Sequence, residues 1–369
     1  MDRRTFLQGS LAGLAPAMAA AQAGAEPLRT GMIGTGLRGQ HTLGGILKQP
    51  NVKITALCDV KPDRLDKAAT LTGRDSPNTF TDYRKLLERK DLDAVFIDTP
   101  CDLHSEMAVA ALQAGKNVYC EKPVGITPKQ VQDVLKAARE SKKVYQVGQQ
   151  MRSFRWLADA IQKIRDGVAG EVVMVKAQRH ASWDLDHSGS SADWFFNAKR
   201  SGDVIVEMAV HNLDLCNWAI GSRPAKASGF GGTLIWKNDP PGRTNMDGYT
   251  LSYEYQNGVK MSFTQNFFHP SGLPGGGQYT NVYCTKGTVS LENGKLYPLE
   301  RGSQPVLLSA PEREDDLPHF AAFFNAVRTG SGVPADIRIG ATAALTAILG
   351  REAIYNGRLM TWEDLGVQV

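Results

Sequence analysis

The sequence predicts an α/β domain with a doubly wound parallel sheet, followed by an α+β domain with a large open antiparallel sheet. Between Leu28 and Gly148, short β-rich runs alternate with longer helical runs, as a parallel sheet with crossover helices requires. Beyond Met151 the rhythm changes, and alternating strands are separated by turn signals such as Gln256-Asn257-Gly258. A chain of 369 residues fits two domains that each bury a core. We therefore expect one domain at residues 28–150 and a second at residues 151–369.

The first domain is expected to hold a sheet covered by helices on both faces, because its β-rich runs are apolar on both sides. The expected strands are Arg29–Ile33, Lys53–Cys58, Ala94–Ile97, Asn117–Cys120 and Lys143–Val147. The expected helices between them are Arg38–Lys48, Lys61–Leu71, Tyr83–Lys90, Ser105–Ala114 and Thr127–Ser141.

The second domain is expected to begin with a helix, a strand and a second helix, at Trp156–Asp166, Val172–Gln178 and Val204–Ile220. Its further strands are expected at Gly248–Tyr255, Val259–Phe268, Tyr279–Cys284 and Gly287–Glu292. The chain then closes with two helical patterns, whose apolar spacing favours packing against a domain, at Leu317–Thr329 and Ile337–Tyr355.

The composition is that of a folded globular protein, with 42% hydrophobic and 22% charged residues. The net charge is only +4, and no dense Lys/Arg stripe is interleaved with aromatic residues, so we expect no nucleic-acid partner. The five cysteines form no C-x-x-C pair. Because a zinc site needs closely spaced Cys and His ligands, we interpret the cysteines as core thiols and predict no metal site.

Residues 1–25 have the features of a signal peptide. The segment Asp2-Arg3-Arg4-Thr5-Phe6-Leu7 precedes a weakly apolar stretch and small residues that offer cleavage sites such as Ala21-Gln22-Ala23. Paired arginines followed by Phe-Leu resemble the twin-arginine class, which carries folded proteins; an ordinary Sec signal or a lipid-free tether is the alternative. The segment predicts a periplasmic or otherwise exported protein that uses the twin-arginine machinery. No later run is long enough to span a bilayer, so we expect no membrane anchor.

A glycine fingerprint lies directly between an apolar strand and a helical pattern. Gly34-Thr35-Gly36-Leu37-Arg38-Gly39 matches G-x-G-x-x-G, and Asp59 follows the next strand. This order of strand, fingerprint, helix, strand and acid predicts dinucleotide binding, with the pyrophosphate at the helix N-terminus and Asp59 at the adenosine ribose. The carboxylate would repel a 2'-phosphate, which favours NAD. The nearby cations Lys61, Arg64 and Arg38 leave NADP open as the alternative.

Further motifs resemble the glucose-fructose oxidoreductase and inositol dehydrogenase family, known as Gfo/Idh/MocA. They are Asp98-Thr99-Pro100 with His104, Gly115 to Glu121-Lys122-Pro123, Ser201-Gly202-Asp203, and Glu207-x-x-x-His211-x-x-Asp214. The resemblance covers nearly the whole chain after the N-terminal segment. Together with the fingerprint it implies cofactor contacts at Gly34, Gly36, Leu37, Arg38, Gly39, Asp59, Thr99, Pro100, His104, Glu121, Lys122 and Gln149.

Three residues are candidates for catalysis. Lys122 follows a strand at the edge where open α/β sheets bind ligands, and its cation can stabilise an alkoxide as hydride leaves the carbon. His211 is suited to be the general base. Glu207, His211 and Asp214 are spaced to share one helical face. In the resembled family an aspartate occupies the place of Glu207, and the longer side chain leaves its role open between substrate binding, orientation of His211 and catalysis.

The segment between the second domain's first strand and its second helix is rich in aromatic and hydrogen-bonding groups, which suit polyol ligands. The expected substrate contacts are Lys122, Arg179, Trp183, Asp184, Trp194, Glu207 and His211. Loop tryptophans also commonly serve only packing, which is the alternative for Trp183 and Trp194.

These observations predict an NAD(P)-dependent oxidoreductase that oxidises a CH–OH group of a sugar or cyclic polyol. An exported enzyme meets little free dinucleotide, so a tightly bound cofactor is expected. Two alternatives remain: an NAD-dependent glycoside hydrolase that oxidises its substrate transiently and eliminates the aglycone, and a binding protein that has lost catalysis. The resemblance further implies a homo-oligomer, either a dimer or a tetramer.

Overall fold

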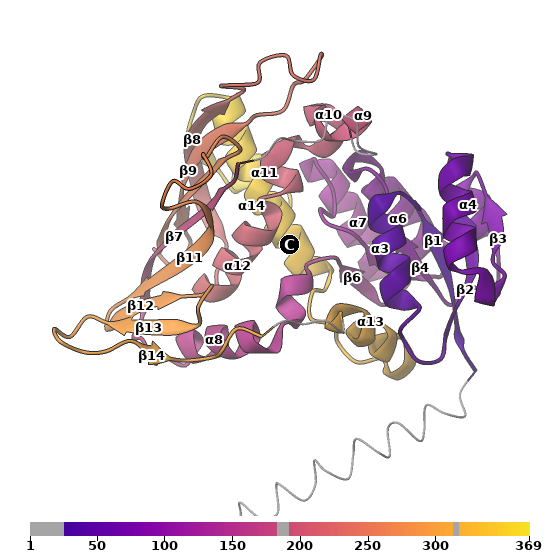
Figure 1. Cartoon of the computed structure of the whole chain (residues 1–369), viewed down its shortest axis with the longest axis horizontal. Coiled ribbons are helices and arrows are strands. Elements are labelled where there is room, and N and C mark those ends of the chain that lie inside the picture. Colours follow the sequence, from indigo (N-terminus) through magenta and orange to yellow (C-terminus); the bar gives the residue numbers. More distant parts are fainter. Residues whose placement is uncertain (1–25, 183–191, 313–316) are drawn as a thin grey trace, which may run out of the picture.

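The computed structural model describes residues 26–182, 192–312 and 317–369. Residues 1–25, Trp183 and Asp184 therefore lie outside the described residues. The chain forms a six-stranded sheet flanked by helices and a nine-stranded sheet, with helices between the two (Figure 1). This architecture confirms the predicted combination of an α/β and an α+β domain.

The six-stranded sheet is entirely parallel, and its strand order is β3-β2-β1-β4-β5-β6. This is the strand order of a Rossmann fold. Strands β2 and β3 are added on one side of β1 and strands β4 to β6 on the other, so the strand order reverses between β1 and β4. The strands are β1 (Leu28–Ile33), β2 (Val52–Cys58), β3 (Asn78–Phe80), β4 (Ala94–Ile97), β5 (Asn117–Cys120) and β6 (Tyr145–Val147). The sequence analysis missed β3, a short edge strand that has no buried residue to mark it.

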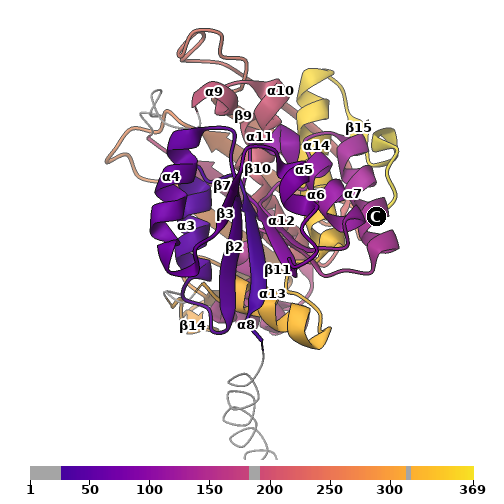
Figure 2. The ribbon, with the colours of Figure 1, turned by 90° about the vertical axis from the view of Figure 1, so that its right-hand side faces the viewer.

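Helices cover both faces of this sheet (Figure 2). They are α3 (Leu37–Ile46), α4 (Pro62–Leu71), α5 (Tyr83–Leu87), α6 (His104–Gln113) and α7 (Pro128–Ser141). In β4, Val95 and Ile97 belong to one apolar cluster, whereas Ala94 and Phe96 belong to a second. Because successive side chains of a strand point to opposite faces, the apolar run seen in the sequence is buried on both sides.

A helix from late in the chain completes one of these clusters. Helix α13 (Pro318–Thr329) places Phe320, Phe323 and Phe324 against the sheet. The ring of Phe96 lies 5.8 Å from that of Phe320 and 5.2 Å from that of Phe323, between centroids. Thus a segment more than 200 residues away contributes to the core of the Rossmann sheet.

The nine-stranded sheet has the order β14-β13-β12-β11-β7-β10-β9-β8-β15. Its strands are β7 (Val172–His180), β8 (Pro224–Gly232), β9 (Gly248–Tyr255), β10 (Lys260–Asn266), β11 (Gly277–Cys284), β12 (Gly287–Ser290), β13 (Lys295–Pro298), β14 (Val306–Leu307) and β15 (Met360–Thr361). The sheet is mixed and not purely antiparallel as predicted, because β7 and β10 pair in parallel. Strand β8 was missed since its Pro and three glycines are unfavourable in strands.

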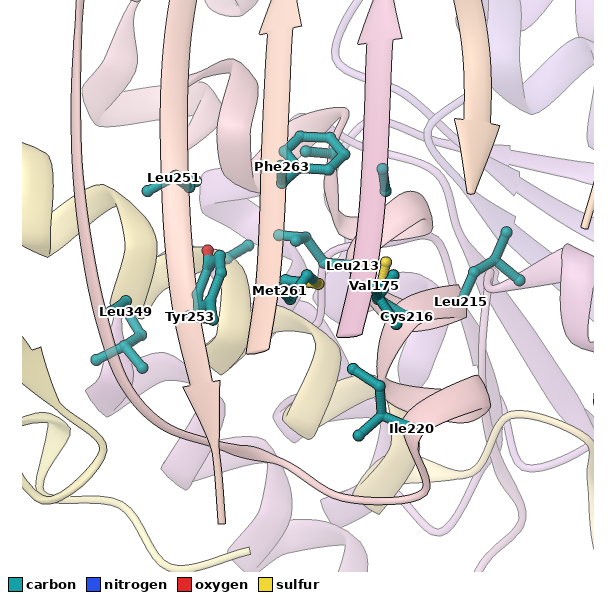
Figure 3. Close-up of a cluster of buried hydrophobic side chains, with 14 of the residues drawn as sticks. Val175, Leu213, Leu215, Cys216, Ile220, Leu251, Tyr253, Met261, Phe263 and Leu349 are labelled. Carbon is teal, nitrogen blue, oxygen red and sulfur yellow. The ribbon is translucent and has the colours of Figure 1, made fainter. Parts of the chain in front are cut away.

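One face of this sheet packs on helices (Figure 1). These are α8 (Arg155–Arg165), α11 (Asp203–Glu207), α12 (Val210–Ile220) and α14 (Ile337–Tyr355), with the short α9 (Ala192–Phe195) and α10 (Ala198–Ser201) near the other domain. Figure 3 shows Leu213 of α12 and Leu349 of α14 in one buried cluster with Met261 and Phe263 of β10. All five cysteines are buried and free. Within the described part of the chain, no helix has the length and apolar character needed to cross a membrane.

The predicted continuous helix Val204–Ile220 is wrong. The structure ends α11 at Glu207 and begins α12 at Val210. The amide of Ala209 donates to the carbonyl of Val204, five residues earlier, at 3.2 Å. Such a wide turn interrupts the regular spacing of an α-helix, and turns of this kind often occur at functional sites.

Candidate active site

A cleft of about 620 Å³ lies at the carboxyl edge of the Rossmann sheet. This edge is where open α/β sheets bind ligands. The cleft is lined by residues from the turns after β1, β2, β4 and β5 and from α9 to α12. Of the residues predicted to form the site, those lining it are Gly34, Gly36, Leu37, Arg38, Asp59, Thr99, Pro100, His104, Glu121, Lys122, Trp194, Glu207 and His211.

The fingerprint turn has the shape of a diphosphate cradle. Gly34 has a φ of +91°, and an added Cβ there would lie 2.5 Å from the carbonyl oxygen of Asp98. An added Cβ on Gly39 would collide with the Gly34 carbonyl. Gly36 is the N-cap of α3 and has no side chain to occupy the helix N-terminus. The backbone N–H groups at that end can therefore meet a phosphate, which fits a dinucleotide.

Asp59 fixes this turn from the end of β2. Its Oδ2 accepts hydrogen bonds from the backbone N–H of Thr35 at 2.8 Å and from the Thr35 hydroxyl at 3.2 Å. Its Oδ1 accepts from the backbone N–H of Lys61 at 2.9 Å. A carboxylate has about four acceptor positions, so Asp59 can still accept a ribose hydroxyl. Lys61 and Arg64 also line the cleft, and the Lys61 ammonium lies 3.7 Å from Asp193.

An ion pair joins the fingerprint to the turn that carries Lys122. The guanidinium of Arg38 donates to Glu121, with Nε 2.9 Å from Oε1. Glu121 is buried, and the carbon of Gly148 packs so closely that an added Cβ would lie 2.7 Å from Oε2. Burial opposes the charge of Glu121, but Arg38 and Lys122 outweigh it and lower its pKa. Glu121 is therefore an ionised carboxylate held inside the domain.

Asp98 is a second buried acid that lines the cleft, and the sequence analysis did not select it. Among the described residues, no hydrogen bond of standard geometry reaches either carboxylate oxygen, and the nearby Thr42 hydroxyl only partly offsets the rise in pKa. Burial, followed by the charge of Glu121, raises the pKa of Asp98 to about 7. Its position directly after the buried strand β4 was the available signal.

Lys122 and Glu207 form a close pair across the cleft. Lys122 Nζ lies 2.6 Å from Glu207 Oε1 and 2.7 Å from the Glu207 carbonyl oxygen. That carbonyl belongs to the last residue of α11, where the helix is interrupted. The two side chains are only 15% and 14% exposed. Burial is the largest effect and acts to lower the pKa of Lys122, but Glu207, Cys101 and Glu121 together raise the pKa above its usual value. The ammonium thus stays charged.

His211 has a different partner from the one that sequence spacing suggests. Its Nδ1 lies 2.9 Å from Oε1 of Gln149, which follows β6. Gln149 was expected to contact the cofactor, but it does not line the cleft and reaches His211 instead. Burial lowers the pKa of His211 to about 3, with help from Lys122 and Arg179. The ring is therefore neutral at pH 7, and one of its nitrogens is unprotonated.

Asp214 does not share the cleft with Glu207 and His211. It forms a bidentate pair with Arg152, in which Nε and Nη2 each lie 2.8 Å from a carboxylate oxygen. The Arg152 guanidinium also lies 4.8 Å from the ring centre of Trp218. This pair binds the segment after β6 to α12 and fixes the helix that presents His211.

His104 supports the turn of Lys122 from the neighbouring strand end. Its ring nitrogens lie 2.8 Å from the carbonyl oxygens of Pro123 and Thr99. It therefore connects the turn after β4 to the turn after β5, besides lining the cleft.

Two further residues were expected to contact the substrate, and only one of them lines the cleft. Trp194 of α9 lines the cleft, whereas Arg179 of β7 does not. Arg179 Nη1 lies 3.5 Å from the Met208 carbonyl oxygen, and its charge helps to lower the pKa of His211. Arg179 therefore lies at the break between α11 and α12, close enough to His211 to affect its pKa.

Comparison with known proteins agrees with this geometry. An oxidoreductase family model with an NAD-binding Rossmann fold matches residues 28–149, and the Gfo/Idh/MocA C-terminal domain model matches residues 157–290. A glycosyl hydrolase family 109 protein of Stenotrophomonas maltophilia is 35% identical over 189 residues, which are 48% of this chain but only 42% of that protein. The 1,5-anhydro-D-fructose reductase of Ensifer adhaerens is 28% identical over 83% of this chain and 90% of its own length.

The fold also recurs in solved structures. An oxidoreductase domain protein of Kribbella flavida has a TM-score of 0.79 and 22% identity, covering 91% of this chain and 99% of its own. The two family models together match most of both domains, and the fingerprint and Glu-Lys-Pro turn meet in the cleft between them. The chain is thus an oxidoreductase that belongs to the Gfo/Idh/MocA family and carries the NAD-binding Rossmann domain of that family.

Proposed function

We propose that this protein is an NAD-dependent dehydrogenase of a sugar or cyclic polyol and that it retains its cofactor. The observation that carries the proposal is the convergence of the fingerprint turn, the charged Lys122 and the neutral His211 in one cleft. Hydride removal from an alcohol needs a bound nucleotide to accept the hydride, a cation to stabilise the charge on the oxygen and a base to take the hydroxyl proton.

The residues present fit the dinucleotide. The glycine turn and the N-terminus of α3 would hold the diphosphate, and Asp59 would accept a ribose hydroxyl. Thr99, which lines the cleft, has a buried hydroxyl without a partner among the described residues. When bound, NAD accepts hydride from the carbon that carries the hydroxyl group. Asp59 supports the preference for NAD, because its charge opposes a 2'-phosphate.

Lys122 has one donor available for the substrate. An ammonium has three N–H groups, and Glu207 accepts two of them through its carboxylate and its carbonyl. The third N–H can donate to the substrate hydroxyl oxygen and stabilise the negative charge that develops there. His211, neutral and with Nδ1 bonded to Gln149, takes the hydroxyl proton at Nε2. Glu207 holds the ammonium in place and keeps it protonated.

The substrate class is supported by the cleft lining and by a relative. Trp194 offers an aromatic face and Asp193 a carboxylate beside it, a combination that suits the apolar faces and hydroxyl groups of sugars. The Ensifer adhaerens relative is a reductase of an anhydro sugar by its name. We propose a dimer or tetramer as the working assembly and twin-arginine export to the periplasm, on the sequence of residues 1–25.

A redox-neutral glycoside hydrolase is the second candidate. The identity of 35% to a glycosyl hydrolase family 109 protein favours it, although the match spans less than half of that protein. Glu207 supplies a carboxylate in the cleft that could take part in elimination after transient oxidation.

The first test is the nucleotide content of the purified protein. We expect NAD or NADH, close to one per chain, in the supernatant of desalted and denatured protein, measured by absorbance and mass spectrometry. Screens of sugars and polyols, alone and in oxidant and reductant pairs, then identify the dehydrogenase substrate. Release of an aglycone from an aryl glycoside without added NAD would instead support the hydrolase. A protein without nucleotide would contradict cofactor retention.

A further inference from the structure

Gln149 is the side chain that contacts the Nδ1 atom of His211. It lies two residues after β6, and its amide oxygen reaches across to α12, 2.9 Å from Nδ1 of the imidazole. Gln149 is 2% exposed, and its amide nitrogen has no partner among the described residues. A buried N–H₂ without an acceptor lowers stability. The side-chain hydrogen bond that the structure gives Gln149 is therefore the one to His211.

The carboxylate that could have served His211 is engaged elsewhere. Glu207 precedes His211 by four residues, but its Oε1 lies 2.6 Å from Lys122. A neutral amide thus meets the imidazole where a carboxylate would hold a protonated ring. Because the amide carries no net charge, it orients His211 without attracting a proton to it.

The charged groups around His211 act in the same direction as the amide. Lys122 at the end of β5, Arg179 on β7 and Arg38 on α3 are cations that disfavour an imidazolium, and only Glu121 opposes them. Together with burial they lower the pKa of His211 to about 3. An amide oxygen accepts but cannot donate, so the hydrogen between Gln149 and His211 belongs to Nδ1.

We propose that Gln149 is a positioning residue that holds His211 in the neutral Nδ1–H tautomer and leaves Nε2 free to accept a proton. This inference rests on the proposed function for the meaning of the free Nε2, but the tautomer itself is a property of the protein without substrate. The two can therefore fail separately.

The test is nitrogen NMR of the full-length purified protein labelled with ¹⁵N-histidine, without added substrate. Long-range ¹H–¹⁵N spectra distinguish a protonated from an unprotonated ring nitrogen, and His211→Asn identifies the His211 signals. In the wild type we expect protonated Nδ1 and unprotonated Nε2 across the neutral pH range, with the imidazolium forming only on strong acidification. Protonated Nε2, or an imidazolium at neutral pH, would overturn the proposal.

Two substitutions separate positioning from packing. In Gln149→Met both tautomers of His211 should become populated, while the melting temperature is unchanged or raised because the unpartnered amide is gone. In Gln149→Glu a carboxylate should stabilise the imidazolium and move its titration about 1–3 pH units upward. Gln162→Met removes a glutamine of α8 that bonds Asp166 on the exposed surface, and it should leave the His211 spectrum as in the wild type. If His211 keeps one tautomer and one titration in all three variants, Gln149 has no positioning role.

If a substrate is found, the acid limb of kcat/KM adds a second readout. It should rise in Gln149→Glu by the same shift as the NMR titration, because both report the same imidazole. If the NMR spectra change as expected but the acid limb of kcat/KM does not move, Gln149 positions His211, and His211 is not the base.

Discussion

Arg38 of the fingerprint and Glu121 of the Glu-Lys-Pro turn meet inside the cleft, with Nε 2.9 Å from Oε1. One residue belongs to the predicted nucleotide cradle and the other is the immediate neighbour of Lys122. The pair therefore connects the part of the site that would hold NAD to the part that would act on the substrate.

Removing the cation of this pair should destabilise the protein. Arg38→Met leaves Glu121 buried without its guanidinium, and we expect a loss of about 1–3 kcal/mol in the free energy of unfolding, reduced from that of a fully buried pair because Arg38 is partly exposed. NAD affinity should fall as well. Urea denaturation and calorimetric titration measure the two effects. Arg29→Met is the control, because it breaks the exposed ion pair of Arg29 with Asp93. It should lower the free energy of unfolding by less than about 1 kcal/mol.

Glu207→Gln should shift the alkaline limb of kcat/KM to lower pH. Among the groups that raise the pKa of Lys122 against burial, Glu207 contributes most, so without its carboxylate the ammonium should lose its proton at lower pH. Activity below the shifted limb should be partly kept, because the amide oxygen can still accept from Lys122. Steady-state rates against pH with a substrate from the screen test this. Glu106→Gln removes a comparable but exposed glutamate pair and should leave the profile unchanged.

Lys122→Met should abolish turnover while nucleotide binding persists. Loss of one donor to a developing oxyanion costs about 10²–10³ in kcat. Equal turnover by the variant and the wild type, with nucleotide content matched, would show that Lys122 does not touch the reacting oxygen.

The buried Asp98 makes stability depend on pH. Its pKa is about 7 in the folded protein, against 3.8 for an aspartate in an unfolded chain. Between these two values the folded state therefore binds more protons than the unfolded state. The free energy of unfolding that Asp98 removes should therefore be small below pH 4, grow as the pH rises towards 7 and stay at its largest above pH 7. Asp98→Asn should remove this loss and gain on the order of a few kcal/mol at pH 8, with little gain at pH 4. Urea unfolding at both pH values decides, and Asp133→Asn on the surface of α7 is the control.

Asp59→Ala should weaken NAD on the order of 10- to 100-fold, because a charged acceptor that also fixes the glycine turn is lost. NADP should be weakened less, since the charge that opposes its 2'-phosphate is removed while Lys61 and Arg64 remain in the cleft. Titration of nucleotide-stripped protein with each dinucleotide measures the ratio, and Asp63→Ala on α4 controls for a general change in charge.

The regular parts of this fold can be predicted because strands buried on both faces, such as β4 and β5, are continuous runs of apolar residues. The sequence analysis missed β3 and β8 because their local composition is unfavourable for strands, and the sequence does not record contacts between distant segments. The interruption between Glu207 and Val210 depends on a carbonyl that meets Lys122, 85 residues away. The sequence marks Gln149 only as an expected cofactor contact and Asp98 only as part of a motif. The packed structure shows that Gln149 bonds His211 and that Asp98 is buried in the cleft.

Helix α13 has a consequence for the order of events during synthesis. The nucleotide-binding sheet lacks part of one hydrophobic face until Phe320, Phe323 and Phe324 arrive, so Phe96 and Tyr119 are uncovered in a nascent chain that stops before residue 318. Such a chain should be recognised by chaperones and should bind nucleotide poorly. Occupancy of the dinucleotide cradle would then report that translation and folding of both domains are finished.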